Sequence, residues 1–376
     1  MTSIECFEEN KWRFEKDEIL YHAVRANVPT VLQDEISEFL AFAHDNQDVM
    51  LELWNYYYVL FLSEELIFPL AKVKEIPISN AAETQFPGLF STVIFLAAAR
   101  HFEEYLVKQN LHTTKFDFLE TYYKNVRRFM DMNYARDNTH ALIRLGEYLY
   151  GYAKPLIMHI GRFAYELRAY ENEVCTICEK DGKRIFVVNE QCQFDKYGYP
   201  VPCDSKDVLT LPNDNINTRI FGEDGFVAQQ ECDISLNEWK QILNPGDLVV
   251  TIHIPGNDKL SQSAIEESLV AAKPILQKVF GTYNPKKLVC TSWLLSPQLS
   301  NILDSKSNIL HFQSYFDIIG WYPAENALYE HIFRSPLCPV EELVPQNRFQ
   351  EGVLRIYREG GKLHNGFGVL KDEWQI

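Results

Sequence analysis

Apolar residues recur every three or four positions through the first part of the chain, with polar residues between them. Two sets show the period clearly: Leu32, Ile36, Phe39 and Leu40, and Leu89, Val93, Leu96 and Ala97. This spacing is typical of helices that bury one face. Residues 116–132 and 141–167 are long stretches rich in Leu, Tyr, Arg and Glu. We therefore expect helix after helix over residues 1–168.

A different pattern begins after Ala169. Short β-branched and aromatic runs alternate with turn residues, as at 184–189. Runs of this kind predict strands and hairpins. A further strand-like segment lies at 309–312, and residues 236–243 predict a short helix with Ser235 as its N-cap.

Two nearly continuous apolar runs, Leu248–Ile254 and Lys287–Leu295, predict buried strands. The helix between them starts near Ser261 to Ser263 and continues to about Phe280. Strand–helix–strand units of this kind are right-handed crossovers in nearly all proteins. The pattern therefore predicts an α+β protein of two domains, an all-helical domain over residues 1–168 and a mixed-sheet α/β domain over residues 169–376.

Composition narrows the setting of the protein. The 376 residues carry 36 Lys and Arg against 52 Asp and Glu, a net charge of −16, which argues against nucleic acid as a partner. No segment approaches the roughly 20 apolar residues that span a bilayer. The first 14 residues lack the apolar core of a signal peptide, and the eight cysteines are sparse. We expect a cytoplasmic protein without a membrane span.

The loop that leaves the first buried strand has the features of an anion site. Backbone N–H groups at a helix N-terminus attract phosphates, and this loop adds Gly256, the cation of Lys259, and hydroxyls at Ser261 and Ser263. It contains neither the P-loop pattern nor the Gly-x-Gly-x-x-Gly of dinucleotide folds. An ordinary surface loop with a serine N-cap accounts equally well for the same residues.

Several segments of this half resemble one bacterial family. They are His253–Ile254–Pro255, Glu267–Ser268, Cys290–Pro297, Ser307–Gln313 and Gly360–Gly368, with Ile160–Phe163 similar to the end of its helical domain. The family is that of acyltransferases with a helical N-terminal domain and a GNAT-like C-terminal domain. The resemblance covers most of the chain. It implies a GNAT-like fold and transfer of an acyl group from a coenzyme A thioester to an amine.

The resemblance also implies where acyl-CoA would lie. Leu248–Ile254 and Lys287–Leu295 would be the two central strands that splay apart, and Gly256–Ser263 would be the pyrophosphate loop. The residues placed on the coenzyme in this way are Thr251, Ile254, Gly256, Asn257, Lys259, Ser261 and Ser263. This loop has one glycine, Gly256, where the family signature reads Gln/Arg-x-x-Gly-x-Gly/Ala.

Acyl transfer to an amine requires a base, a polarised carbonyl and a proton for the departing thiolate. His253, at the end of the first strand, is a candidate base, because the ordinary imidazole pKa suits that role. Ser292 on the second strand is a candidate donor. Structural roles, a hydrogen-bonded histidine and a serine that caps a backbone group, remain open for both. Tyr315 and Tyr322 are later candidates for the acid, and nothing in the sequence selects either.

The cysteines give a weak indication of zinc. Cys175 and Cys178 form a C-x-x-C pair, but Cys192 and Cys203 are too far apart in sequence to close a typical site. We expect no metal. The leading hypothesis is an acyl-CoA-dependent N-acyltransferase. The thin pyrophosphate signature keeps open a non-catalytic protein that binds a ligand or a protein on a GNAT-like scaffold, and a zinc-stabilised interaction module is a third possibility.

Overall fold

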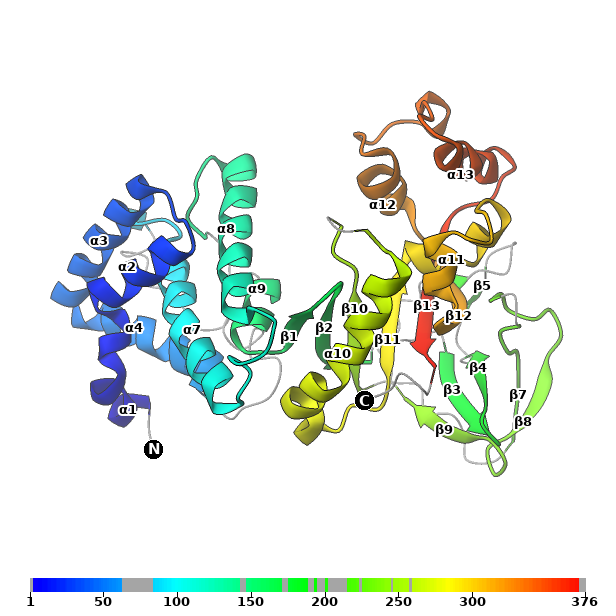
Figure 1. Ribbon diagram of the computed structural model, residues 1–376, viewed down its shortest axis with the longest axis horizontal. Helices are drawn as coiled ribbons and strands as arrows, with labels where there is room; N and C mark the ends of the chain where they lie inside the picture. Colours follow the sequence, from blue (N-terminus) through cyan, green and yellow to red (C-terminus); the bar gives the residue numbers. More distant parts are fainter. Residues whose placement is uncertain are drawn as a thin grey trace. The chain divides into compact units, whose positions relative to one another are not determined.

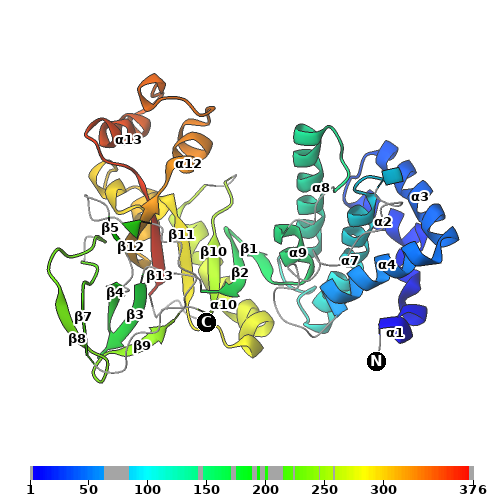
Figure 2. The same cartoon turned by 180° about the vertical axis from the view of Figure 1, so that it is seen from behind.

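Contacts divide the chain into two compact units, Met1–His159 and Ile160–Ile376, which are described separately here. The computed structural model (Figures 1 and 2) describes residues 3–62, 84–142, 147–170, 175–188, 193–194, 200–201, 215–222, 225–244, 246–256 and 259–371. The fold class predicted from the sequence is confirmed. A helical N-terminal region is followed by a mixed sheet with helices.

The first unit is a helical bundle around α7. Its helices are α1 (Ser3–Asn10), η1 (Lys11–Phe14), α2 (Lys16–Arg25), α3 (Thr30–Asp45), α4 (Gln47–Tyr57), η2 (Tyr58–Leu62), α7 (Leu89–Lys108), α8 (Phe118–Asp137) and α9 (Glu147–Ala153). Every residue of α7 from Leu89 to Ala99 is buried, and α2, α3, α4, α8 and α9 pack against this helix. The apolar face predicted for α3 is buried as expected.

One predicted helix is in part a hairpin. The segment expected to be helical ends at residue 168, but its last residues form β1 (Ile157–Ile160) and most of β2 (Phe163–Ala169). Gly161 makes the turn with φ +61°, a backbone region that favours glycine. Phe163, Tyr165 and Leu167 are buried while Glu166 and Arg168 are partly exposed, which is the alternation of a strand.

The second unit is built on a six-stranded sheet with the order β1-β2-β10-β11-β13-β12. Its other strands are β10 (Leu248–His253), β11 (Leu288–Ser292), β12 (Phe316–Pro323) and β13 (His364–Leu370). β10 runs parallel to β11 and antiparallel to β2, and β13 pairs antiparallel with both β11 and β12. Helix α10 (Gln262–Phe280) connects β10 to β11, as the sequence predicted.

Helix α10 covers one face of this sheet (Figure 1). Ser268 of α10 donates its hydroxyl to the carbonyl oxygen of Ile160 at 2.5 Å and lies 3.0 Å from the Tyr165 hydroxyl. A Cβ on Gly161 would lie 3.2 Å from the Ser268 Cβ. The glycine turn of the β1–β2 hairpin therefore also allows the helix to approach closely.

A smaller sheet packs on the other face. It has the order β4-β3-β9, formed by β3 (Cys175–Lys180), β4 (Lys183–Val188) and β9 (Lys240–Leu243). Two-stranded pieces accompany it: β5 (Gln193–Phe194) with β6 (Pro200–Val201), and β7 (Asn215–Thr218) with β8 (Cys232–Ser235). Val249, Val289 and Phe367 of the large sheet share one core with Ile177 and Phe186 of the small one. The helix predicted at 236–243 is wrong, because this segment is a turn followed by β9.

The chain between β11 and β13 forms a helical cap with its own apolar core. Its elements other than β12 are η4 (Trp293–Leu295), η5 (Pro297–Asn301), α11 (Asn308–Gln313), α12 (Glu325–Ala327), η6 (Leu328–Phe333), η7 (Val340–Glu342) and α13 (Arg348–Arg358). The short helix η3 (Gly281–Tyr283) lies between α10 and β11. The strand predicted at 309–312 is wrong. It is helix α11, whose N-cap Ser307 accepts from the Ile309 amide.

Candidate functional site

The parallel strands β10 and β11 part toward their carboxyl ends. Their register pairs Val250 with Leu288 and Thr251 with Val289, and no later pair is formed between them among the described residues. Each strand nevertheless continues, β10 paired with β2 as far as His253 and β11 paired with β13 as far as Ser292. The two strand ends are therefore held by their outer neighbours and not by each other.

His253 lies at this parting point and is paired with a carboxylate. Its Nε2 lies 2.6 Å from Oε2 of Glu166 on β2, and the two side chains are 25% and 21% exposed. Thr251 is directly opposite Glu166, so His253, two residues further on, projects from the same face. In neutral histidine this contact places the proton on Nε2 and the lone pair on Nδ1. Such an imidazole can accept a proton at Nδ1 while the carboxylate stabilises the cation.

Glu166 was not predicted from the sequence. The segment that carries it was expected to be helical, and a helix would have carried this carboxylate away from His253. The alternation of buried and partly exposed residues along β2 was the available signal. Its interpretation as a strand would have allowed Glu166 to lie on a strand that pairs with β10.

Ser292 and His253 are not brought together. Thr251 is level with Val289, so the register puts Thr291 on the face of His253 and Ser292 on the opposite face. The Ser292 hydroxyl accepts a hydrogen bond from the Leu294 amide at 3.1 Å and caps η4. The role of Ser292 as a donor stays a prediction.

The loop before α10 has a free cation and an ordered helix start. Ser261 is the N-cap of α10, and its hydroxyl accepts from the Ala264 amide at 3.3 Å and lies 3.3 Å from the Ser263 hydroxyl. Lys259 is exposed, and its side chain has no ion-pair partner within the described ranges. A Cβ on Gly256 would meet nothing within 4 Å. Asn257 lies outside the described residues, Thr251 is buried within β10, and Ile254 follows directly after that strand.

Tyr315 is joined to the first turns of α10. Its hydroxyl donates to Glu266 Oε1 at 3.0 Å and lies 3.0 Å from His311 Nε2. Burial, followed by the hydrogen bond to Glu266, raises the pKa of Tyr315 to about 12. The phenol is therefore protonated at neutral pH and oriented by two neighbours. The side chain of Tyr322 lies outside what the structure describes.

The C-x-x-C pair does not form a metal site. Cys175 and Cys178 are three positions apart on β3, which sends their side chains to opposite faces of the strand. Cys175 belongs to the core shared with the large sheet, and Cys178 to the core with Ile216 and Ile234. Cys192 and Cys203 lie outside the described residues. In the part of the chain that is described, no three potential ligands gather around one point.

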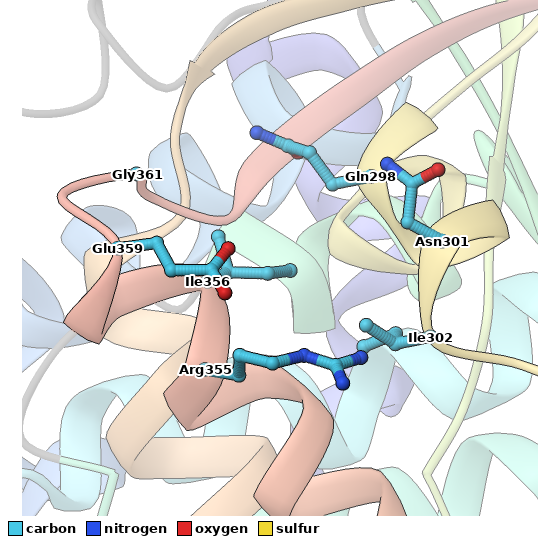
Figure 3. A pocket seen from close by; sticks show the side chains of 7 residues that line it. All are labelled: Gln298, Asn301, Ile302, Arg355, Ile356, Glu359 and Gly361. Atoms are coloured by element: carbon cyan, nitrogen blue, oxygen red, sulfur yellow. The ribbon is translucent and has the colours of Figure 1, made fainter.

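An open pocket of about 580 Å³ lies between η5 and α13 (Figure 3). Its lining includes Gln298, Asn301 and Ile302 on one side and Arg355 and Glu359 on the other. The sequence did not single out any of these residues.

Among the described helices, none combines the length and the apolar content needed to cross a bilayer.

Comparison with known proteins agrees with this architecture. Residues 157–370 match the family model of the GNAT-like C-terminal domain. A solved acyltransferase in complex with decanoyl-CoA is 16% identical, with a TM-score of 0.54 over 94% of this chain and 88% of that one. A mutant acyltransferase in complex with octanoyl-CoA is 14% identical, with a TM-score of 0.52 over 94% and 88%. An acyltransferase in complex with CoA and 10C-Teicoplanin is 14% identical, with a TM-score of 0.50 over 93% and 86%.

At these identities the solved structures show a common fold and nothing more. No curated protein sequence matches the chain.

Proposed function

Because the chain belongs to the GNAT-like C-terminal domain family, we propose that it is an acyl-coenzyme A-dependent N-acyltransferase. The observation that carries the proposal is the pair His253–Glu166 at the point where β10 and β11 part, beside the loop that enters α10. The solved structures of similar fold include complexes with decanoyl-CoA and octanoyl-CoA, which supports an acyl thioester as the donor.

In the proposed complex the thioester lies between the parted ends of β10 and β11. Backbone groups there are available to a ligand, because the two strands do not pair with each other. The diphosphate lies on the loop before α10, where the amides of the helix start and the Lys259 cation stabilise negative charge. The path is proposed to be lined by Ile254, Gly256, Ser261 and Ser263, with Thr251 at its base. Asn257, outside the described residues, stays a prediction from the sequence.

The reaction needs one proton acceptor and one proton donor. The amine nitrogen attacks the thioester carbonyl carbon, the carbon–sulfur bond breaks, and an amide and free coenzyme A result. His253 accepts the proton that the amine loses, and Glu166 stabilises the resulting imidazolium. Ser292 is proposed to donate a hydrogen bond to the carbonyl oxygen or the thiolate, and the departing thiolate takes its proton from solvent. Thr291, exposed on the face of His253, is the alternative for the same role.

The test is binding followed by turnover. Coenzyme A, octanoyl-CoA and decanoyl-CoA at about 100 times their Kd are each expected to stabilise the protein by roughly 2.7 kcal/mol, seen as a rise in Tm. The double variant Lys259→Ala/Ser263→Ala is expected to weaken this binding about tenfold, as loss of a charged hydrogen bond does. Lys278→Ala, an exposed lysine at the other end of α10, is the matched control.

Equal affinity of the double variant and the control for coenzyme A would show that the coenzyme does not bind at this loop. Absence of any thermal shift with all three compounds would favour the non-catalytic binding protein. A rise in Tm without release of free coenzyme A thiol in the presence of any amine would favour the non-catalytic binding protein as well.

A further inference from the structure

The pocket of Figure 3 contains two opposite charges that are not paired. Arg355 on α13 and Glu359, the C-cap of this helix, stand one turn apart, and both are exposed. Within the described part of the chain, neither side chain has a hydrogen-bond or ion-pair partner, including the other one. In Figure 3 the Arg355 side chain extends toward Ile302, while the Glu359 carboxylate points into the space between α13 and the segment with Gln298 and Asn301.

The opposite wall of the pocket is fixed. Gln298 is buried, and its Nε2 donates to the Lys362 carbonyl at 2.6 Å and lies 2.7 Å from His364 Nδ1. Its Oε1 accepts from the Ser296 hydroxyl at 2.5 Å. Gln298 therefore ties η5 to the start of β13 and has no amide hydrogen left for a ligand. The Asn301 amide is exposed and has no partner among the described residues.

The charges select the class of ligand. A phosphate would meet Arg355 but would be repelled by Glu359, and an acyl chain would form a hydrogen bond with neither charge. A molecule with one carboxylate and one ammonium satisfies both, and charge-assisted hydrogen bonds to a guanidinium and a carboxylate are the strong ones. A volume of about 580 Å³ suits a small molecule. We infer that this pocket binds the head group of an α-amino acid, its carboxylate on Arg355 and its ammonium on Glu359.

The pocket is connected to the end of β11 through the start of β13. Gln298 is bonded to His364, the first residue of β13, and Gly366, two residues later, pairs with Ser292 at the end of β11. Two residues of strand span roughly 7 Å. Resting on the proposed function, the amino acid is the acceptor, and the amine at the far end of its side chain is the one acylated.

Binding can be measured on the full chain without any thioester. L-Lysine, L-lysinamide and n-butylamine are the probes, because they share the side-chain amine and lose first the charge of the carboxylate and then the whole head group. Calorimetric titration is expected to show lysine binding, with lysinamide and n-butylamine at least tenfold weaker. Arg355→Gln and Glu359→Gln should each weaken lysine binding at least tenfold. Arg358→Gln, an exposed arginine on the same helix outside the pocket, should leave it unchanged.

No lysine binding overturns the inference, as does binding that Arg355→Gln and Arg358→Gln affect equally. Both arginines are exposed, and circular dichroism of each variant checks that the fold is kept. Titration with octanoyl-CoA in parallel separates the two proposals. Lysine binding without thioester binding contradicts the proposed function alone, and thioester binding without lysine binding contradicts the pocket alone.

Discussion

Glu166 and His253 come from strands that are neighbours in the sheet but 87 positions apart in the chain, and their side chains meet at 2.6 Å. Neither strand alone can hold the imidazole in place. The antiparallel register of β2 with β10, which sets Glu166 opposite Thr251, does so.

Replacement of Glu166 by Gln is expected to lower kcat/KM for acyl transfer by about ten- to a hundredfold, no more than the lower end of general-base effects, because Glu166 acts through His253. Gln keeps the size of the side chain but not the charge that stabilises the imidazolium. In a His253→Ala background the same change should have almost no further effect, because two groups that act as a unit are not additive. Glu267→Gln, the same change at an exposed carboxylate on α10, is the control. Additive losses in the double variant would show that Glu166 acts elsewhere.

Replacement by alanine should destabilise the protein strongly at one glycine and hardly at all at another. A Cβ on Gly366 would lie 1.9 Å from the Leu295 carbonyl oxygen, which is backbone and cannot rotate away. Gly366→Ala is therefore expected to destabilise the protein by about 3 kcal/mol or more. Gly256→Ala, with open space around the new methyl group, should stay within about 0.5 kcal/mol. Urea unfolding compares the two, and similar losses would contradict the close approach of η4 to β13.

Burial lowers the pKa of His101 on α7 to about 4. The unfolded chain then binds a proton near the ordinary pKa of 6.5 that the folded chain does not. Stability is therefore present above pH 6.5 and is lost as the pH falls from 6.5 toward 4, by about 2–3 kcal/mol from this group. His101→Gln should reduce this pH dependence, whereas His112→Gln, at an exposed position, should not. Chemical unfolding at pH 4.5 and 7 measures the difference for both variants.

An ion pair joins the two sheets of the second unit. Arg184 Nη1 on β4 lies 2.5 Å from Asp317 Oδ2 on β12, and the arginine side chain is 7% exposed. Asp317→Ala is expected to cost about 3 kcal/mol, because it leaves a buried guanidinium without its counter-charge. Glu238→Ala removes the exposed ion pair with Lys180 on the small sheet and should not change Tm. Recovery of stability in Arg184→Met/Asp317→Leu would identify the unpaired charge as the cause.

The central part of the fold follows from local pattern. Continuous apolar runs predicted β10 and β11, and the Ser261 N-cap predicted the start of α10, because these signals lie within a few residues of one another. The strand predicted over residues 287–295 is wrong at its end, because β11 stops at Ser292 and residues 293–295 form η4. The β1–β2 hairpin was predicted as helix, since Leu and Arg favour helices locally and the pairing with β10 is formed across the sheet.

The candidate site was predicted only in part for the same reason. His253 ends a run that the sequence shows plainly, but its partner Glu166 depends on a register that no local pattern specifies. The pocket beside α13 depends on side chains whose spacing in sequence carries no motif. Residues 236–243 were predicted as helix and contain strand β9, and residues 309–312 were predicted as strand and lie in helix α11. Short apolar runs fit either structure, and packing decides between the two.

The place of β13 in the sheet affects how the protein is made. This strand follows every other strand of the large sheet in the chain, yet it lies between β11 and β12. During synthesis β11 and β12 therefore leave the ribosome with facing edges that have no partner. Unpaired edges of this kind recruit other chains. Residues 364–370 fill this gap, so the large sheet is completed only by the last strand of the described chain.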